Sequence, residues 1–259
     1  MSFFTDYEKH VSEREKEGVP PLALNAKQTS EICKLIKLAG NSSGDEKAQN
    51  ELKFLINLLT NRVNPGVDDA AKIKAEFLGE VIEGLSIIGL DAVRAIKILG
   101  KMLGGYNVEI LVRALKNSDD VIAQAAANEL KNIILVHEYF DEIAKLANSN
   151  KFAKEVLVSW ANAEWFRHKK PLDECIKAVV FKVPGETNTD DLSPASEAYT
   201  RADIPLHAKA MLVKKMPEGL EILKELKSLG KSVAYVGDVV GTGSSRKSGI
   251  NSIQWHLGD

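Results

Sequence analysis

The sequence predicts a chain of two structural classes, a long helical domain followed by an α/β domain. Apolar residues recur at three- and four-residue spacing from about Thr5 to His168, which is the period of amphipathic helices. After Pro171 the pattern changes to β-rich segments, a glycine-rich stretch and a further helix, which is the order of elements in an α/β fold. Because 259 residues suffice for two domains with separate cores, we predict a helical domain over residues 1–168 and an α/β domain over residues 169–259.

The helical domain is predicted from separate apolar stripes divided by short polar breaks. The stripes are Leu52, Leu55, Ile56 and Leu59, then Ala92, Ala95, Ile96 and Leu99, and then Ile122, Ala126, Leu130, Ile133 and Ile134. The breaks fall at residues 41–44, 64–66, 104–105, 117–120 and 148–150. Paired helices without a strict sequence period are typical of a HEAT-like α-solenoid, whose long exposed faces bind partners. A plain helical bundle that serves only as an attachment is the alternative.

The α/β domain is predicted from two β-rich segments, each followed by polar or glycine-rich residues. In chain order the predicted elements are a strand over 178–183, a polar turn over 184–191, a helix over 220–229, a strand over 232–236, a glycine-rich loop over 237–243 and a helix through Trp255. A loop at the carboxyl end of a strand that opens a helix is where α/β folds place their ligands. The functional site is therefore expected after the second strand.

Composition and charge exclude several classes of protein. With 44% hydrophobic residues, 27% charged residues and a net charge of -2, the chain has no overall basic field, so a nucleic-acid partner would need a local patch. No apolar run is long enough to cross a bilayer and the start lacks a secretory signal, which predicts a cytoplasmic protein without a membrane partner. Cys33 and Cys175 are far apart and outside any Cys-x-x-Cys pair, so neither a disulfide framework nor a zinc site is predicted.

The segment from Gly241 to Arg246 has the residue types of a small-anion receptor. Glycines permit close backbone approach, Ser244 and Ser245 add hydroxyl groups, and Arg246 offers a planar fork that matches a carboxylate. The spacing does not fit a P-loop or a dinucleotide-binding fingerprint, and it does not fit a hydrolase nucleophile elbow. On the pattern alone, a solvent-exposed glycine and serine turn is the alternative to an anion site.

Two segments resemble the aconitase and isopropylmalate isomerase superfamily. Gly-Ser-Ser-Arg at residues 243–246 resembles the serine-arginine loop of its swivelling domain, and residues 189–193 resemble that domain's Thr-Asp-His-Ile-Ser segment. Residues 181–194 and 234–248 look specifically like the bacterial B type, which places a HEAT-like domain and then the swivelling domain ahead of the cluster-binding domains. In the helical half, residues 58–67, 104–107 and 159–165 also resemble that type, so the likeness covers essentially the whole chain.

The resemblance implies a hydro-lyase that interconverts citrate and isocitrate through cis-aconitate in the tricarboxylic acid cycle, with 2-methylisocitrate as a further candidate substrate. It implies that Ser244 is the catalytic base, that Gly243 and Ser245 help to bind substrate, and that Arg246 holds a carboxylate. Asp190 and Ser193 are the corresponding supporting residues of the substrate site, and Arg201 and His207 are further candidates for its cleft. In some relatives histidine and glutamate occupy the positions of Asp191 and Lys247.

The resemblance also implies a 4Fe-4S cluster held by three cysteines in the complete enzyme. The two cysteines of this chain cannot supply three thiolates, so we expect an amino-terminal fragment with an incomplete swivelling domain that binds no cluster or metal and is inactive alone. The implied partners are the tricarboxylic acid substrates, a second copy bound through the helical domain, and mRNA in the cluster-free form. The alternative function is a protein- or RNA-binding regulatory module formed by the helical domain.

Overall fold

A computed structural model describes residues 3–40, 45–133 and 136–258, and its chain divides into two compact units. The first unit holds Met1–Tyr7 and Leu22–Lys170, and the second holds Glu8–Pro21 and Pro171–Asp259. These units reflect compactness alone, and the domain limits of 1–168 and 169–259 stay a prediction. The predicted break at 41–44 and Ile134 of the third apolar stripe lie outside the described residues.

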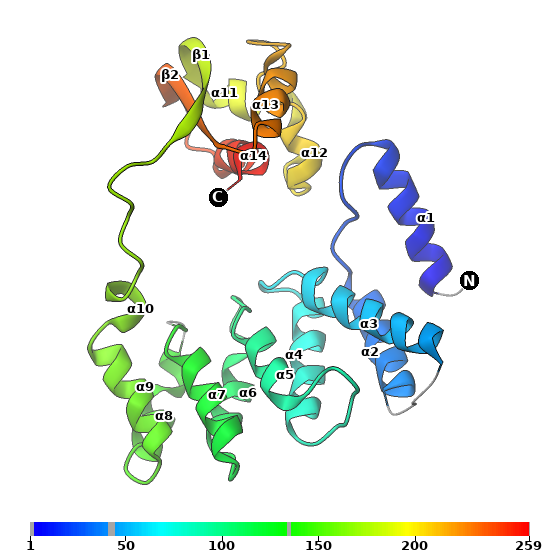
Figure 1. Ribbon diagram of the computed structural model, residues 1–259, viewed down its shortest axis with the longest axis vertical. Coiled ribbons are helices and arrows are strands. Elements are labelled where there is room, and N and C mark those ends of the chain that lie inside the picture. The colour runs from blue at the N-terminus through cyan, green and yellow to red at the C-terminus, as the bar shows by residue number, and fades with distance from the viewer. Residues whose placement is uncertain (1–2, 41–44, 134–135, 259) are drawn as a thin grey trace. The chain divides into compact units, whose positions relative to one another are not determined.

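The first unit is built from helices stacked in pairs. The helices are α1 (Phe3–Lys16, of which only the first turn belongs here), α2 (Ala26–Ala39), α3 (Glu46–Asn61), α4 (Asp69–Ile82), α5 (Ala92–Leu99), α6 (Val108–Leu115), α7 (Asp120–Leu130), α8 (Phe140–Leu146), α9 (Lys151–Ala161) and α10 (Glu164–Arg167). A short 3-10 helix over His137–Tyr139 precedes α8. Figure 1 shows α2 to α9 following one another in a row.

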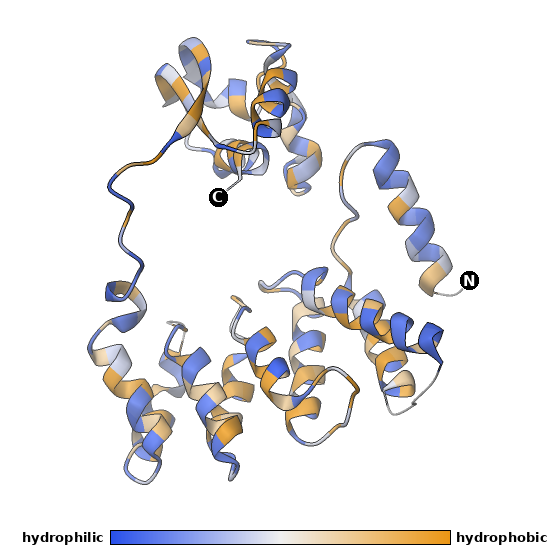
Figure 2. Cartoon of the chain, viewed as in Figure 1, coloured by the Kyte–Doolittle hydropathy of each residue, from blue (hydrophilic) through white to orange (hydrophobic). Residues whose placement is uncertain are grey.

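The packing of these helices is that of a solenoid. Helix α2 packs against α3 and α4, α4 against α6, α5 against α7, and α7 against α9, so several helices contact the helix two positions further on. Fully buried leucine and isoleucine side chains lie between them, namely Leu59, Leu78, Ile96, Leu99, Leu111, Leu115 and Leu130. In Figure 2 hydrophobic and hydrophilic residues lie side by side on the same helices, as amphipathic elements require. The predicted helical domain is confirmed.

Side-chain caps fix the starts of several of these helices. The side chains of Asn25, Asp45, Asp68, Asp91 and Asn150 each accept a hydrogen bond from a backbone N–H in the first turn, at 2.7 to 3.0 Å. Each bond satisfies one of the donors that a helix leaves unpaired at its start, which is typically worth about 1 kcal/mol. Asn150 lies in the predicted break at 148–150, and Asp45 and Asp68 follow the breaks at 41–44 and 64–66, whereas Asn25 and Asp91 cap helices at no predicted break.

The second unit contains a parallel two-stranded sheet with helices around it. Its elements are β1 (Ala178–Asn188), α11 (Thr189–Leu192), a 3-10 helix (Ala195–Thr200), α12 (Ile204–Ala208), α13 (Gly219–Ser228), β2 (Ser232–Thr242) and α14 (Lys247–Leu257). The register runs from Ala178 opposite Ser232 to Asn188 opposite Thr242, with irregularities after Val183 and after Thr187. The predicted α/β class is confirmed.

Both strands are longer than the sequence suggests. The predicted polar turn at 184–191 is largely strand, and the predicted glycine-rich loop at 237–243 is strand up to Thr242. Pairing between the two strands satisfies the backbone despite the glycines, and the Asp238 carboxylate accepts the N–H of Gly185 at 2.6 Å where the register shifts. The loop that carries the predicted site is therefore only four residues long, from Gly243 to Arg246.

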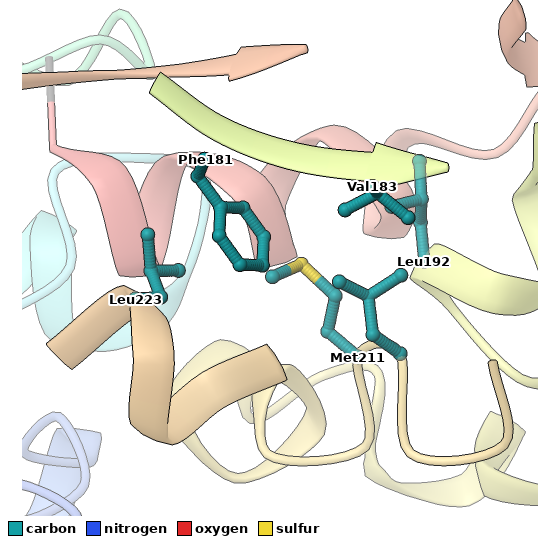
Figure 3. Packing of buried hydrophobic residues seen from close by; sticks show 6 residues of the cluster. Phe181, Val183, Leu192, Met211 and Leu223 are labelled. Atoms are coloured by element: carbon teal, nitrogen blue, oxygen red, sulfur yellow. The ribbon is translucent and has the colours of Figure 1, made fainter. Parts of the chain in front are cut away.

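An apolar cluster between β1 and the surrounding helices forms the core of this unit (Figure 3). Its fully or almost fully buried members are Phe181, Val183, Leu192, Met211, Leu212 and Leu223. The ring of Phe181 meets that of Tyr235 on β2 edge to face, with centroids 5.6 Å apart. Leu192 lies in α11, so this core fixes the short helix that follows β1.

The described helices include none that is both long enough and apolar enough to cross a bilayer.

Candidate active site

The predicted site residues lie where the two parallel strands end. The carboxyl ends of parallel strands meet at the same edge of a sheet, and Asn188 at the end of β1 is opposite Thr242 at the end of β2. Asp190 and Ser193 follow β1 directly, while the loop over residues 243–246 follows β2. The topology thus places two segments at least fifty residues apart in sequence next to each other.

Asn188 shapes the turn after β1. Its side chain accepts hydrogen bonds from the backbone N–H groups of Asp190 and Asp191, at 2.8 and 3.0 Å. The Asp191 carboxylate in turn accepts the N–H of Asn188 at 2.9 Å, which completes a capping box at the start of α11. Asp191 is therefore a structural residue of this turn.

Gly243 allows the loop after β2 to approach this turn. Its φ angle is 90°, in the region that side-chain-bearing residues rarely adopt, and a Cβ atom at this position would lie 3.1 Å from Thr189 Oγ1. Gly241 has a similar φ of 86°, but a Cβ atom there would meet open space. Only Gly243 is needed for the close contact between the two segments.

Arg246 links the two segments directly. Its Nη1 donates to Asp190 Oδ1 and, at 3.0 Å, to the backbone oxygen of Ser193. The hydrogen bond from Arg246 lowers the pKa of the Asp190 carboxyl below its usual range, and the N–H of Ala195 assists. In the described part of the chain both contacts of Arg246 use Nη1, so Nε and Nη2 remain available as donors to an anion.

Ser193 is fully buried beneath this arginine. Its Oγ lies 2.8 Å from His207 Nε2 in α12 and 2.6 Å from Ser248 Oγ in the first turn of α14. His207 Nδ1 lies 2.8 Å from Thr200 Oγ1. Sequence reasoning missed Ser248 because a lone serine at a helix start has no distinctive pattern, and it gave His207 only as a candidate for the cleft.

Ser244 and Ser245 are exposed in the loop between β2 and α14. Within the described residues neither hydroxyl has a hydrogen bond, and Arg246 precedes α14 without a side-chain cap at that helix. The serines share a four-residue loop with Gly243 and Arg246, but no contact joins them to Asp190 or Ser193 among those residues. Arg201, the remaining candidate, has its Nε buried without a hydrogen-bond partner there.

A pocket of about 170 Å³ opens beside Asp190. Asp190, Asp191 and Lys214 contribute the charged groups of its lining, and Pro194 and Val213 contribute apolar surface. Ser244, Ser245 and Arg246 are not part of this lining. The pocket therefore flanks the arginine-carboxylate pair and does not include the serine loop.

The cysteines do not fit a cluster site. Cys33 is buried in α2, where desolvation raises the pKa of its thiol to about 12, while Cys175 is exposed before β1 in the other compact unit. An iron–sulfur cluster requires thiolates that converge on it. Across the described ranges no three His, Cys, Asp or Glu side chains are grouped as metal ligands.

Comparison with known proteins identifies the family. Residues 6–166 match the family described as "Aconitate B N-terminal domain", and residues 178–259 match "Aconitate hydratase 2 N-terminus". The chain is 52% identical to aconitate hydratase B of Helicobacter pylori over 257 residues, which are 99% of this chain and 29% of that protein.

Two further relatives show similar identity and coverage. Aconitate hydratase B of Synechocystis is 52% identical over 97% of the chain and 28% of its own length, and that of Escherichia coli is 46% identical over 98% of the chain and 30% of its own length. The chain thus spans about three tenths of the length of the curated relatives it matches. It belongs to the aconitate hydratase B family.

Proposed function

We propose that this chain supplies the serine-arginine substrate loop of an aconitate hydratase that interconverts citrate and isocitrate through cis-aconitate. The observation that carries the proposal is the contact of Arg246 with Asp190 and the Ser193 carbonyl at the carboxyl ends of both strands. This contact holds the guanidinium beside Ser244 and Ser245 and leaves donors available for a substrate carboxylate. The complete enzyme acts in the cytoplasm, and 2-methylisocitrate is a second candidate substrate.

In this proposal Ser244 removes the carbon-bound proton of the substrate. A serine hydroxyl is a poor base, so its Oγ needs surroundings that stabilise the alkoxide. The start of α14 and the charge of Arg246 are both close in sequence and provide positive potential. Arg246 binds a substrate carboxylate, and Ser245 and the backbone at Gly243 add hydrogen bonds to it. Asp190 and Ser193 act through Arg246 by holding its guanidinium in place.

The 4Fe-4S cluster that the family implies, a Lewis acid for the departing hydroxyl, would have to be held by cysteines outside this chain. The buried Cys33 and the exposed Cys175 do not form a cluster site, and so we assign no step of the reaction to the cluster here. The residues of this chain bind substrate, orient it and take its proton.

A chimera tests the assignment. This chain would replace the corresponding residues of the Helicobacter pylori relative, and cis-aconitate formation would be followed by its absorbance after reconstitution of the cluster. We expect an active chimera, a loss of about 10³-fold or more in kcat for Ser244→Ala, and a large rise in KM for Arg246→Lys because the lysine cannot form the planar fork.

Ser232→Ala is the matched control, since Ser232 is exposed at the start of β2, at the opposite end of the strand from the loop. It should retain normal kinetics. A chimera that folds and carries its cluster but lacks activity, or that keeps activity in Ser244→Ala, would contradict the proposal.

A second function, binding of a protein partner by the helical unit, is favoured over RNA binding by the charges on its helices. Five basic side chains of this unit pair with acidic ones of neighbouring segments, namely Lys37 with Glu80, Arg113 with Glu83, Lys116 with Glu142, Lys131 with Glu155 and Lys151 with Asp120. An RNA backbone requires a run of unpaired positive charge. We propose that the partner is a second copy, so light scattering should report a dimer, and tight binding of single-stranded RNA at physiological salt would contradict this choice.

A further inference from the structure

His207 lies at the centre of a buried chain of hydrogen bonds below the substrate loop. The imidazole is 2% exposed, and each of its nitrogens has a hydroxyl partner at 2.8 Å: Thr200 at Nδ1 and Ser193 at Nε2. Ser193 Oγ continues the chain to Ser248 Oγ at 2.6 Å. The chain therefore joins α12, the segment after β1 and the start of α14.

The donors and acceptors of this chain have one consistent direction. Thr200 Oγ1 donates to the Glu197 carbonyl at 2.8 Å, so its own proton is used and it can only accept from His207 Nδ1. Burial lowers the pKa of His207, which keeps the ring neutral and makes Nε2 an acceptor. Ser193 must then donate to Nε2, and Ser248 must donate to Ser193.

This chain of hydrogen bonds includes two residues close to Arg246, namely Ser193 and Ser248. The backbone oxygen of Ser193 accepts from Arg246 Nη1 at 3.0 Å, and Ser248 lies two positions after Arg246 in α14. A second contact joins the same helices, because His256 Nε2 lies 2.8 Å from the Ala208 carbonyl and donates to it. His207 is thereby linked through Ser193 Oγ to the residue whose carbonyl accepts from Arg246, and through Ser248 Oγ to the helix that follows Arg246.

We propose that His207 is a positioning residue, which holds Ser193 and Ser248 so that the Arg246 guanidinium meets the substrate carboxylate in one orientation. This inference rests on the proposed function and deepens it by assigning the histidine below the loop. His207 does not touch the substrate in this scheme. Its effect passes through the Oγ and the carbonyl of Ser193.

Two substitutions separate the two sides of the ring. In His207→Gln the longer amide reaches the position of Nε2 and can still accept from Ser193, whereas the shorter amide of His207→Asn reaches only Thr200. In the chimera, we expect His207→Asn to lower kcat/KM about tenfold, mostly through KM, while His207→Gln stays within about threefold of the parent. Ser193→Ala should match His207→Asn, since it removes the same link without changing the ring.

A structural readout on this chain accompanies the kinetics. Nitrogen-15 chemical shifts of the His207 ring should report a proton on Nδ1 and none on Nε2, and amide hydrogen exchange in residues 243–248 should accelerate in His207→Asn but not in His207→Gln. A proton on Nε2, or equal kinetics and equal exchange for the two variants, would overturn the proposal. If both variants unfold, a parent-like kcat/KM for Ser193→Ala in the chimera, or a proton on Nε2 of the parent ring, would still overturn the proposal.

The same assay separates this proposal from the proposed function. If Ser244→Ala abolishes activity while His207→Asn behaves as the parent, the positioning role is wrong and the serine-arginine loop stands. If Ser244→Ala leaves activity intact, the proposed function is wrong whatever His207 does.

Discussion

Arg14 and Asp203, which are 189 positions apart in the sequence, form a two-point ion pair in the second compact unit. Arg14 Nη1 lies 2.7 Å from Asp203 Oδ2, and Nη2 lies 3.0 Å from Oδ1. Arg14 is 7% exposed, and its Nε donates to the Pro20 carbonyl at 2.9 Å. Asp203 is also the N-cap of α12, where it accepts from the N–H of Leu206 at 3.4 Å. An arginine of the amino-terminal helix thus supports the helix that carries His207.

Arg14→Met should destabilise the second unit by about 3 kcal/mol, because it leaves the Asp203 carboxylate partly buried without its counter-charge. The measurement is urea denaturation, with amide hydrogen exchange in α12 as the local readout. Lys9→Met is the matched control in the same helix, since its pair with Glu13 is exposed on both sides and should be worth less than about 1 kcal/mol. Equal effects of the two substitutions would show that the Arg14 pair contributes no more stability than the exposed pair of Lys9.

Gly243→Ala should disturb the candidate site more than Gly241→Ala. Both positions have positive φ angles, so each alanine costs about 1–2 kcal/mol of backbone strain. At Gly243 the new methyl group also lies 3.1 Å from Thr189 Oγ1, which pushes the loop away from the turn after β1. We expect a further loss of several-fold in kcat/KM of the chimera for Gly243→Ala alone, and similar kinetics for both variants would contradict the close-contact role of Gly243.

Much of the fold follows from the sequence because amphipathic period and capping residues are local signals. The stripe around Leu55 and Leu59 lies in α3 with both leucines buried, and Asp45, directly after the predicted break at 41–44, caps that helix. Strand length was not predictable in the same way. Whether β2 continues past Gly237 to Thr242 depends on pairing with β1, which is a non-local interaction.

The candidate site, too, could be predicted from the sequence only in part. The serine-arginine loop is recognisable by resemblance, but the contacts that hold Arg246 come from Asp190 and the carbonyl of Ser193, and a backbone oxygen leaves no trace in a sequence pattern. No local sequence pattern indicates that Glu8–Pro21 belongs to the second unit either. Arg14 lies in a charged amphipathic helix, where sequence patterns predict an ordinary solvated cation. Such long-range pairs become visible only in the folded chain.

Lys74 should make the stability of the first unit depend on pH at alkaline values. The side chain is buried in α4 and donates to the Thr60 carbonyl at 2.9 Å, and desolvation followed by the charge of Lys101 lowers its pKa from 10.5 to about 8. Between these two values the unfolded chain holds a proton that the folded chain has lost, so stability rises with pH in this window. Below pH 8 Lys74 is protonated in both the folded and the unfolded chain, so the free-energy cost of burying its charge does not change with pH.

The test compares the parent with Lys74→Met at several pH values between 7 and 11. The difference in unfolding free energy should shift in favour of the parent by up to about 1.4 kcal/mol per pH unit between 8 and 10.5, since methionine does not titrate. The subtraction removes the titration of other lysines and tyrosines. A difference that stays flat across this range would mean that Lys74 keeps an ordinary pKa.

Ala163→Gly should stabilise the end of α9, although it removes a methyl group. Ala163 follows the C-cap Asn162 and adopts φ 51° and ψ 41°, the left-handed conformation in which a Cβ atom is unfavourable. Glycine relieves about 1–2 kcal/mol of backbone strain there. It also raises the conformational entropy of the unfolded chain, which opposes folding by a smaller amount, so the net gain in folding stability is about 0.5–1 kcal/mol. Ala161→Gly is the matched control, because Ala161 is the exposed last residue of α9, outside the left-handed region, and should lose stability by less than the roughly 1 kcal/mol of a helix interior. Thermal denaturation of the two variants should therefore move in opposite directions, and a lower melting temperature for both would show that the left-handed geometry at Ala163 carries no strain.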